Sequence, residues 1–284
     1  MSAIDHYAYG LLTPAVAYVM SSVGCMLGLL LTSRARLVNA KESRYWLAGA
    51  AIAIGGTGIW TMHFIAMTGF AVHGTAIRYD VPLTVGSAVI AIVVVGAGLF
   101  LVRQGGERLP FLFGGGALTG IGVAGMHYLG MAAMNMSAHV SYDPLLVAAS
   151  VLIAIAAATT ALWFTLRVHG ALRIGAAALV MGVAVTGMHF TGMYALSVEV
   201  HPETAPIAGA RPIDFMLPVI VGISVVTMGL LLALVLSPSE RELRREQEFL
   251  DRLRDRRGGD EPPAAGKGAP EVDLFGTPRG PAVS

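Results

Sequence analysis

The chain has 284 residues and a formal net charge of +1, and 55% of its residues are hydrophobic whereas 13% are charged. Soluble globular chains carry about 25% charged residues. This composition therefore excludes a typical soluble enzyme, a disordered chain and a disulfide-built secreted domain. It also argues against a nucleic-acid partner, because no basic face is present. The single cysteine, Cys25, excludes an intramolecular disulfide and a thiolate metal cage. The chain is expected to be an integral membrane protein with the lipid bilayer as its main partner.

Seven apolar runs are long enough to cross a membrane. A run of about 20 apolar residues spans the hydrocarbon core as a helix. The predicted spans are residues 11–32, 45–72, 81–102, 110–136, 145–166, 172–197 and 215–236. The ten residues before the first span contain no Lys or Arg, which disfavours a cleaved signal peptide.

Basic residues near the span ends predict the orientation. The connections after spans one, three and five carry eight Lys and Arg residues, whereas those on the opposite side carry only Arg78 and Arg211. The basic side belongs in the cytoplasm. We therefore expect a multi-pass protein of the bacterial cytoplasmic membrane with its N-terminus outside and its C-terminus inside.

The composition changes after the last span. Residues 238–257 are dense in Arg and Glu and predict a short charged cytoplasmic helix. Residues 258–284 are rich in Pro, Gly and Ala and predict a disordered cytoplasmic tail. The membrane domain is accordingly expected to cover residues 1–237.

Three segments in the even-numbered spans align without gaps. Each has a glycine, a small residue two positions later, and then the pattern small-Met-His-aromatic-x-small-Met. The segments are residues 56–67, 120–131 and 182–193. Because their histidines lie 64 and 62 residues apart, each repeat should be a helical hairpin with the motif in its second helix. The predicted fold class is all-α integral membrane, with seven transmembrane helices built from three parallel helical-hairpin repeats plus a seventh helix.

The motif histidines are the main polar feature of the predicted spans. They are His63, His127 and His189, and the topology puts all three at one depth in the outer half of the membrane. An ionisable side chain within a span is costly and marks a functional site by default. The glycines that open the motifs are expected to let helices approach closely around one axis. These glycines are Gly56, Gly120 and Gly182.

More of the repeat lies beyond the spans. A histidine follows each motif histidine by 10 or 12 residues, as either a solvated loop residue or an accessory outer-face site that loads metal from the periplasm. These residues are His73, His139 and His201. An aspartate then opens each following span, and helix N-capping is its leading interpretation. These residues are Asp80, Asp143 and Asp214.

The motif combines two kinds of metal ligand. Its histidine and second methionine are four residues apart, which places both on one helix face. Imidazole suits copper, zinc, iron and nickel, whereas thioether selects soft ions, chiefly Cu(I), so the pair favours copper. The alternative interpretation is a packing device, in which a methionine fills space beside a hydrogen-bonded histidine and the repeat has merely copied it.

The thrice-repeated Met-His-Tyr/Phe segment resembles the bacterial MHYT domain over about residues 8–237. The resemblance implies a seven-span membrane sensory domain, with its motifs near the periplasmic face, that binds copper and senses a diatomic gas such as oxygen, carbon monoxide or nitric oxide. The metal ligands that it implies are Met62, His63, Met67, Met126, His127, Met131, Met188, His189 and Met193. The motif aromatic is tyrosine only at Tyr128, and the next residue is threonine only at Thr191, so a ligand role for either hydroxyl is not expected.

Together the pattern and the resemblance favour a copper-dependent sensor that is not an enzyme and that signals to a separate cytoplasmic or membrane partner. A membrane copper carrier or insertion factor for respiratory enzymes would use the same ligands and is the first alternative. A haem protein with two membrane histidines as axial ligands is the second.

Overall fold

The computed structural model of the chain describes residues 4–201, 206–237, 245 and 248–253. The chain forms two units, residues 1–237 and 238–284. In the second unit, residues 248–253 are helical. The rest of the predicted charged helix at 238–257 and the whole predicted tail at 258–284 lie outside the described residues, so both stay predictions.

The first unit confirms the predicted fold class: its described residues contain seven helical spans long and apolar enough to cross a membrane. The second span is continuous but consists of three helical segments, of which the middle one, η1, is a π-helix. The elements are α1 (Leu12–Ala35), α2 (Ala40–Ala51), η1 (Ile52–Trp60), α3 (Thr61–Thr68), α4 (Val81–Gly105), α5 (Leu109–Ala132), α6 (Pro144–Arg167), α7 (Ala171–Tyr194) and α8 (Pro212–Leu236).

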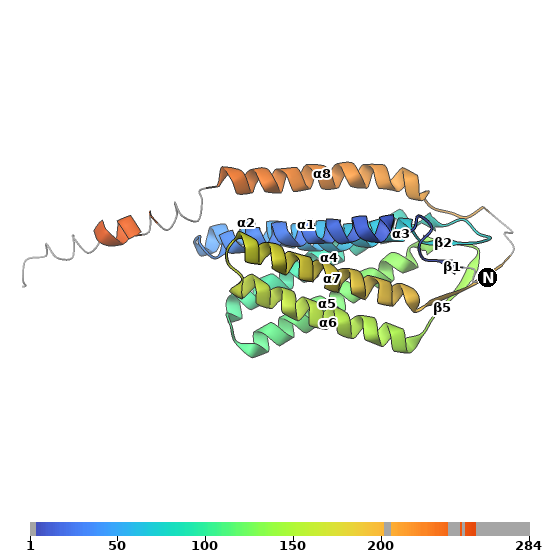
Figure 1. The fold of residues 1–284 in the computed structure, drawn as a ribbon, viewed down its shortest axis with the longest axis horizontal. Helices are drawn as coiled ribbons and strands as arrows, with labels where there is room; N and C mark the ends of the chain where they lie inside the picture. Colours follow the sequence, from blue (N-terminus) through green and yellow to red (C-terminus); the bar gives the residue numbers. More distant parts are fainter. Residues whose placement is uncertain (1–3, 202–205, 238–244, 246–247, 254–284) are drawn as a thin grey trace, which may run out of the picture. The chain divides into compact units, whose positions relative to one another are not determined.

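Short strands close each hairpin repeat at one end of the helices, which we call the strand end (Figure 1). In every repeat, the segment before the first helix pairs antiparallel with the segment after the motif helix. The pairs are β1 (Ile4–Asp5) with β2 (Ala71–Val72), β3 (Arg78–Tyr79) with β4 (Met134–Asn135), and β5 (Ala138–Tyr142) with β6 (Leu196–Val200). The three repeats therefore share one tertiary design and not only one motif.

The six helical spans of the repeats pack in a closed ring. In ring order they are α1, the second span, α4, α5, α6 and α7, which returns to α1. The motif helices also touch across the ring, since α7 contacts both α3 and α5. Helix α8 lies outside the ring, where it contacts α1 and η1 (Figure 1).

Arginines cap helix ends at the opposite end of the unit, which we call the basic end. Arg36 donates hydrogen bonds to the carbonyl oxygens of Thr165 and Val168, at the C-terminus of α6. Arg103 donates to the carbonyl oxygen of Ala35, at the C-terminus of α1, over 3.0 Å. A cation satisfies the last carbonyls of a helix and interacts favourably with its dipole. These residues therefore tie neighbouring repeats together.

N-capping is confirmed for two of the three predicted aspartates. Asp80 accepts a hydrogen bond from the backbone N–H of Leu83, and Asp143 accepts from Leu145 and Leu146. The prediction is wrong for Asp214, because α8 begins two residues earlier, at Pro212. Proline suits the first helical position, so Asp214 falls inside the first turn and pairs with Arg211 instead, at 2.8 Å.

The predicted role of the motif glycines holds in two repeats and is wrong in the first. A Cβ on Gly120 or Gly182 would lie under 3.0 Å from α6 or α1, whereas the nearest neighbours of one on Gly56 would be side-chain atoms of Ile92 and Ile52, the closest at 3.6 Å. Its neighbour Gly55 makes the close approach, since a Cβ there would lie 2.6 Å from the carbonyl oxygen of Ala91 on α4. The wider turns of η1 hold one extra residue between this glycine and the motif histidine, which an alignment without gaps cannot register.

Candidate metal centre

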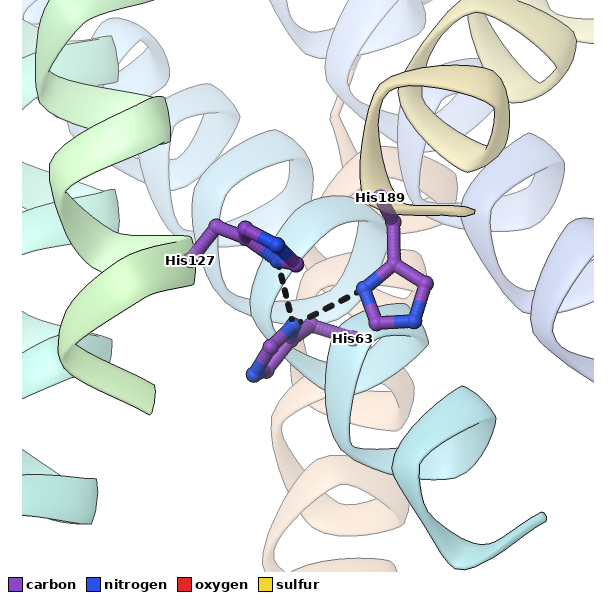
Figure 2. Close-up of side chains that lie close together, drawn as sticks. All are labelled: His63, His127 and His189. Atoms are coloured by element: carbon purple, nitrogen blue, oxygen red, sulfur yellow. Dashed lines mark hydrogen bonds between the residues drawn. The ribbon is translucent and has the colours of Figure 1, made fainter. Parts of the chain in front are cut away.

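The three motif histidines meet on the ring axis. His63 comes from α3, His127 from α5 and His189 from α7, and Figure 2 shows their rings converging on one point. The Nδ1 atom of His63 lies 3.0 Å from Nδ1 of His189 and 3.1 Å from Nδ1 of His127. Each pair of rings stands nearly edge to face, at 82–85° between planes. The sequence predicts three histidines at one depth, and the structure adds that their rings contact one another.

This histidine triad is fully buried. The three side chains are at most 1% exposed. They form the one group of His, Cys, Asp or Glu residues within the described part of the chain that is arranged to hold a metal ion. Within the described residues no carboxylate belongs to this group, so three imidazole nitrogens are the ligands that it offers.

A metal ion would engage the three histidines more completely than hydrogen bonds among their own nitrogens can. A neutral imidazole carries a single N–H, so the three facing Nδ1 atoms cannot all be paired by hydrogen bonds among themselves. One cation would engage all three lone pairs at once. Nitrogens bound at 2.0–2.1 Å to one ion lie about 3.3–3.6 Å apart. The two Nδ1 distances from His63, 3.0 and 3.1 Å, are a few tenths of an ångström shorter, and the ligand atoms of all three histidines lie within 4.8 Å of one another.

The far edges of two of the three rings lie against glycines. All three Nε2 atoms are buried and have no hydrogen-bond partner. A Cβ on Gly130 would lie under 3.0 Å from Nε2 of His63, and one on Gly192 would lie under 3.0 Å from Nε2 of His127. The motif helix of one repeat thus supports the histidine ring of another through these two residues. We call Gly130 and Gly192 the shelf glycines.

Sequence reasoning missed this role of Gly130 and Gly192, although the signal was visible. Both occupy the small position three residues after a motif histidine, and the first repeat has Ala66 there. The pattern was recognised as small, but only the ring arrangement shows which side chain the missing Cβ makes room for.

The six motif methionines are all buried, at 1–3% exposed. Met188 also lines an internal cavity beside the triad. The methionines Met62, Met67, Met126, Met131 and Met193 belong to the same apolar core. Their predicted role as ligands stays a prediction.

The tyrosine and threonine hydroxyls of the motifs form hydrogen bonds away from the triad. The Tyr128 hydroxyl lies 2.7 Å from the Ser150 hydroxyl on α6. The Thr191 hydroxyl donates to the carbonyl oxygen of Gly187 in its own helix. Both hydroxyls are therefore hydrogen-bonded outside the triad.

The accessory histidines lie apart from the triad on the exposed surface of the strand end. His73, His139 and His201 are all exposed, and His139 faces Glu199 across the β5–β6 ribbon. None joins a metal-holding group within the described residues. Their role in loading metal stays a prediction.

The N-terminal segment at residues 4–10 packs over the strand end of α7. The Tyr7 hydroxyl lies 2.9 Å from that of Tyr194, and this hydrogen bond, with burial, raises the pKa of Tyr7 to about 12. The His6 ring packs between Phe70 and Tyr194, with centroids 5.7 and 4.8 Å away. Burial lowers the pKa of His6, and the nearby Asp5 charge opposes that shift. No role was predicted for His6 from sequence.

Comparisons with known proteins agree with this arrangement. The family described as "Bacterial signalling protein N terminal repeat", MHYT, matches residues 56–115, 120–178 and 182–245. Each matched repeat begins at a motif helix and runs on through the next span. The family repeat thus pairs each motif helix with the span that follows it, so the matches include α8 and leave out α1.

Several curated signalling proteins are similar to the chain. The bifunctional diguanylate cyclase/cyclic di-GMP phosphodiesterase MucR of Pseudomonas aeruginosa is 35% identical over 239 residues, which are 80% of this chain and 34% of that protein. The cyclic di-GMP phosphodiesterase NbdA of the same organism is 36% identical over 72% of this chain and 27% of its own length. The signaling protein YkoW of Bacillus subtilis is 31% identical over 71% of this chain and 25% of its own.

The chain spans about a third or less of the length of these relatives. The activities in their names therefore belong to those whole proteins. No solved structure is significantly similar to the chain.

Proposed function

Because the chain belongs to the MHYT family of bacterial signalling proteins, we propose that it is a membrane sensor whose histidine triad holds one metal ion. The proposed ion is copper, and the proposed signal is a diatomic gas or a change in the redox state of the ion. The strand end would face the periplasm and the basic end the cytoplasm. The part of the chain at residues 1–237 would act as a sensory domain and not as an enzyme.

The observation that carries this proposal is the convergence of three buried Nδ1 atoms that cannot satisfy one another. A polar side chain within a membrane span is costly to bury without a hydrogen-bond partner. Three repeats nevertheless bring the same polar atom to the same point. A packing device would need no such convergence, because one hydrogen-bonded histidine per hairpin would serve it equally well.

Copper is favoured by the ligand chemistry. Three neutral imidazoles suit Cu and Zn alike, and the buried motif methionines tip the preference towards Cu(I), because thioether is a soft ligand. Copper would supply a one-electron redox couple and a coordination position for a small ligand. The chain itself holds the three nitrogens in place, buries them and packs the rings of His63 and His127 against glycines of other motif helices.

The two alternatives fit the described geometry less well. Haem iron takes its axial ligands on opposite faces of a planar macrocycle, whereas these nitrogens converge with 3.0–3.1 Å between them. A carrier needs a series of ligands along a path. The cavity beside the triad is lined by apolar residues except for two threonines, and two methionines are the only soft donors among them.

A route for the signal leads from the triad to α8. Helix η1 runs into α3, which carries His63, and α8 packs on η1 and α1. A ligand can shift such packing only by binding two arrangements with unequal affinity. Movement of α8 would then be read by a cytoplasmic or membrane partner.

Metal analysis of the purified protein tests the proposal. The wild type should hold about one copper per chain, and the His63→Ala, His127→Ala and His189→Ala variants should each lose most of it, because two imidazoles remain. His169→Ala is the matched control, since His169 is exposed at the basic end. Equal copper in the triad variants and the control would refute the proposal, provided that thermal unfolding shows all of them to be folded.

A further inference from the structure

A cavity of about 50 Å³ lies directly inward of the histidine triad, and its position follows from the helix period. The residue four positions before each motif histidine lies one turn nearer the basic end on the same face. These residues are Ile59, Val123 and Val185, and all three line the cavity. They form a ring of apolar side chains between the triad and the space below it.

A second ring repeats this arrangement one turn further on. Thr119 and Met181 precede their histidines by eight residues, and Ile54 precedes His63 by nine, because η1 contains the extra residue. All three line the cavity as well. The π-helix therefore brings the first repeat into register with the other two around this space, so the cavity belongs to the axis of the bundle.

Alanines on α6 leave the space open. Ala154, Ala157, Ala158 and Ala161 form one helix face along the cavity wall. The equivalent of Ala158 on α4, counted from the N-capping aspartates, is the larger Val95, which lines the opposite wall. A leucine or valine in place of these alanines would fill the space, so the sequence of α6 keeps the cavity.

The two hydroxyl groups of the lining already donate their protons to backbone carbonyl groups. The Thr119 hydroxyl donates to the carbonyl oxygen of Val94, and the Thr165 hydroxyl donates to that of Leu162. A buried water needs two to four polar partners, and apolar cavities without them stay dry and take up apolar guests. The engineered cavity of about 150 Å³ that binds benzene is three times larger, so only a guest of a few heavy atoms fits here.

We propose that this axial cavity is a binding chamber for one small, uncharged, apolar molecule, held next to the histidine triad on its basic side. The ring of Ile59, Val123 and Val185 separates guest and triad by a single layer of side chains. A guest that displaces this ring presses on the turn of helix that carries each histidine. The chamber itself does not require a bound metal; its sensory consequence rests on the proposed function.

Xenon is the probe for the test. Nuclear magnetic resonance of dissolved xenon, titrated into the full chain in lipid nanodiscs, should show saturable binding. Ala158→Leu fills the chamber and should abolish the saturable component. Ala156→Leu makes the same change on the exposed face of the same helix and should leave it intact. Val185→Ala enlarges the chamber and should strengthen binding.

The chamber and the metal proposal can fail separately. Ala158→Leu should keep its copper, and His63→Ala should keep its xenon binding. Wild-type protein without saturable xenon binding would overturn the chamber whatever its metal content. Equal xenon binding in Ala158→Leu and Ala156→Leu would also overturn it. Loss of copper from the triad variants bears only on the proposed function.

Discussion

The first motif helix and its two counterparts differ in ways that show how the site is built. In α5 and α7, a regular α-helix joins the packing glycine to the histidine in seven residues. In the first repeat, η1 takes eight residues from Gly55 to His63. The glycine and the histidine reach equivalent positions in all three repeats. The first repeat does so with an irregular helix, so the positions at the axis are kept although the helix type is not.

The small position after the histidine differs as well. Two repeats have glycines there, beneath His63 and His127, and the first has Ala66. The triad is thus only pseudo-symmetric. We expect one histidine to be held differently from the other two, and the following predictions break or sharpen that comparison.

Deleting one residue from the motif helices should have the largest effect. Deletion of Ile121 in α5 rotates everything on one side of the gap by about 100° relative to the other, so Gly120 and His127 can no longer both reach their partners. We expect no folded, copper-binding protein. Deletion of Gly56 removes the extra residue of η1 and should leave a folded protein. Size-exclusion chromatography and thermal unfolding in detergent measure this; equal loss in both deletions would contradict the register argument.

Alanine substitution should change the stability of the protein differently at Gly55 and at Gly56. A Cβ at Gly55 would strike the α4 backbone, which cannot move aside as a side chain can, and we expect a loss of about 1–3 kcal/mol or more. Alanine at Gly56 should be neutral or stabilise by up to about 1 kcal/mol, because glycine is a poor helix former. Unfolding midpoints of the two variants decide the matter, and a costlier Gly56→Ala would show that the sequence alignment was right.

Alanine at the shelf glycines should weaken metal binding. Gly130→Ala and Gly192→Ala would push His63 and His127 out of place. Groups that orient metal ligands typically contribute 10–100-fold in affinity, and we expect a loss of copper affinity in that range. The reverse change, Ala66→Gly, should leave affinity within about threefold and cost about 1 kcal/mol of stability. Competition with a chelator of known affinity measures all three variants.

The smallest effect concerns pH at the strand end. The pKa of His6 is lowered in the folded protein, so folding favours its neutral form. Protection of residues 4–10 should be complete above the ordinary histidine pKa of 6.5 and decline as the pH falls below it. Hydrogen exchange of this segment between pH 5 and 8 measures the effect. A His6→Gln variant should give a flat profile, and an unchanged slope in that variant would assign the effect to another group.

Much of this protein was predictable from its sequence. Hydropathy determined seven spans, because a bilayer leaves no other place for apolar runs of this length. The repeat period determined that three motif helices are equivalent and that their histidines share one depth. Three aspartates were predicted as N-caps, and the prediction is confirmed for the two that stand within two residues before a proline, Asp80 and Asp143.

Only the tertiary structure decided the rest. The sequence contains no sign that η1 is a π-helix, because one extra residue in an apolar glycine-rich run leaves hydropathy unchanged. The shelf of Gly130 beneath His63 joins two repeats, and a motif read within one helix cannot say which neighbour it faces. The axial cavity likewise depends on where five helical elements leave space. Sequence periodicity fixes what each helix presents along its own length, whereas ring closure determines what those faces meet.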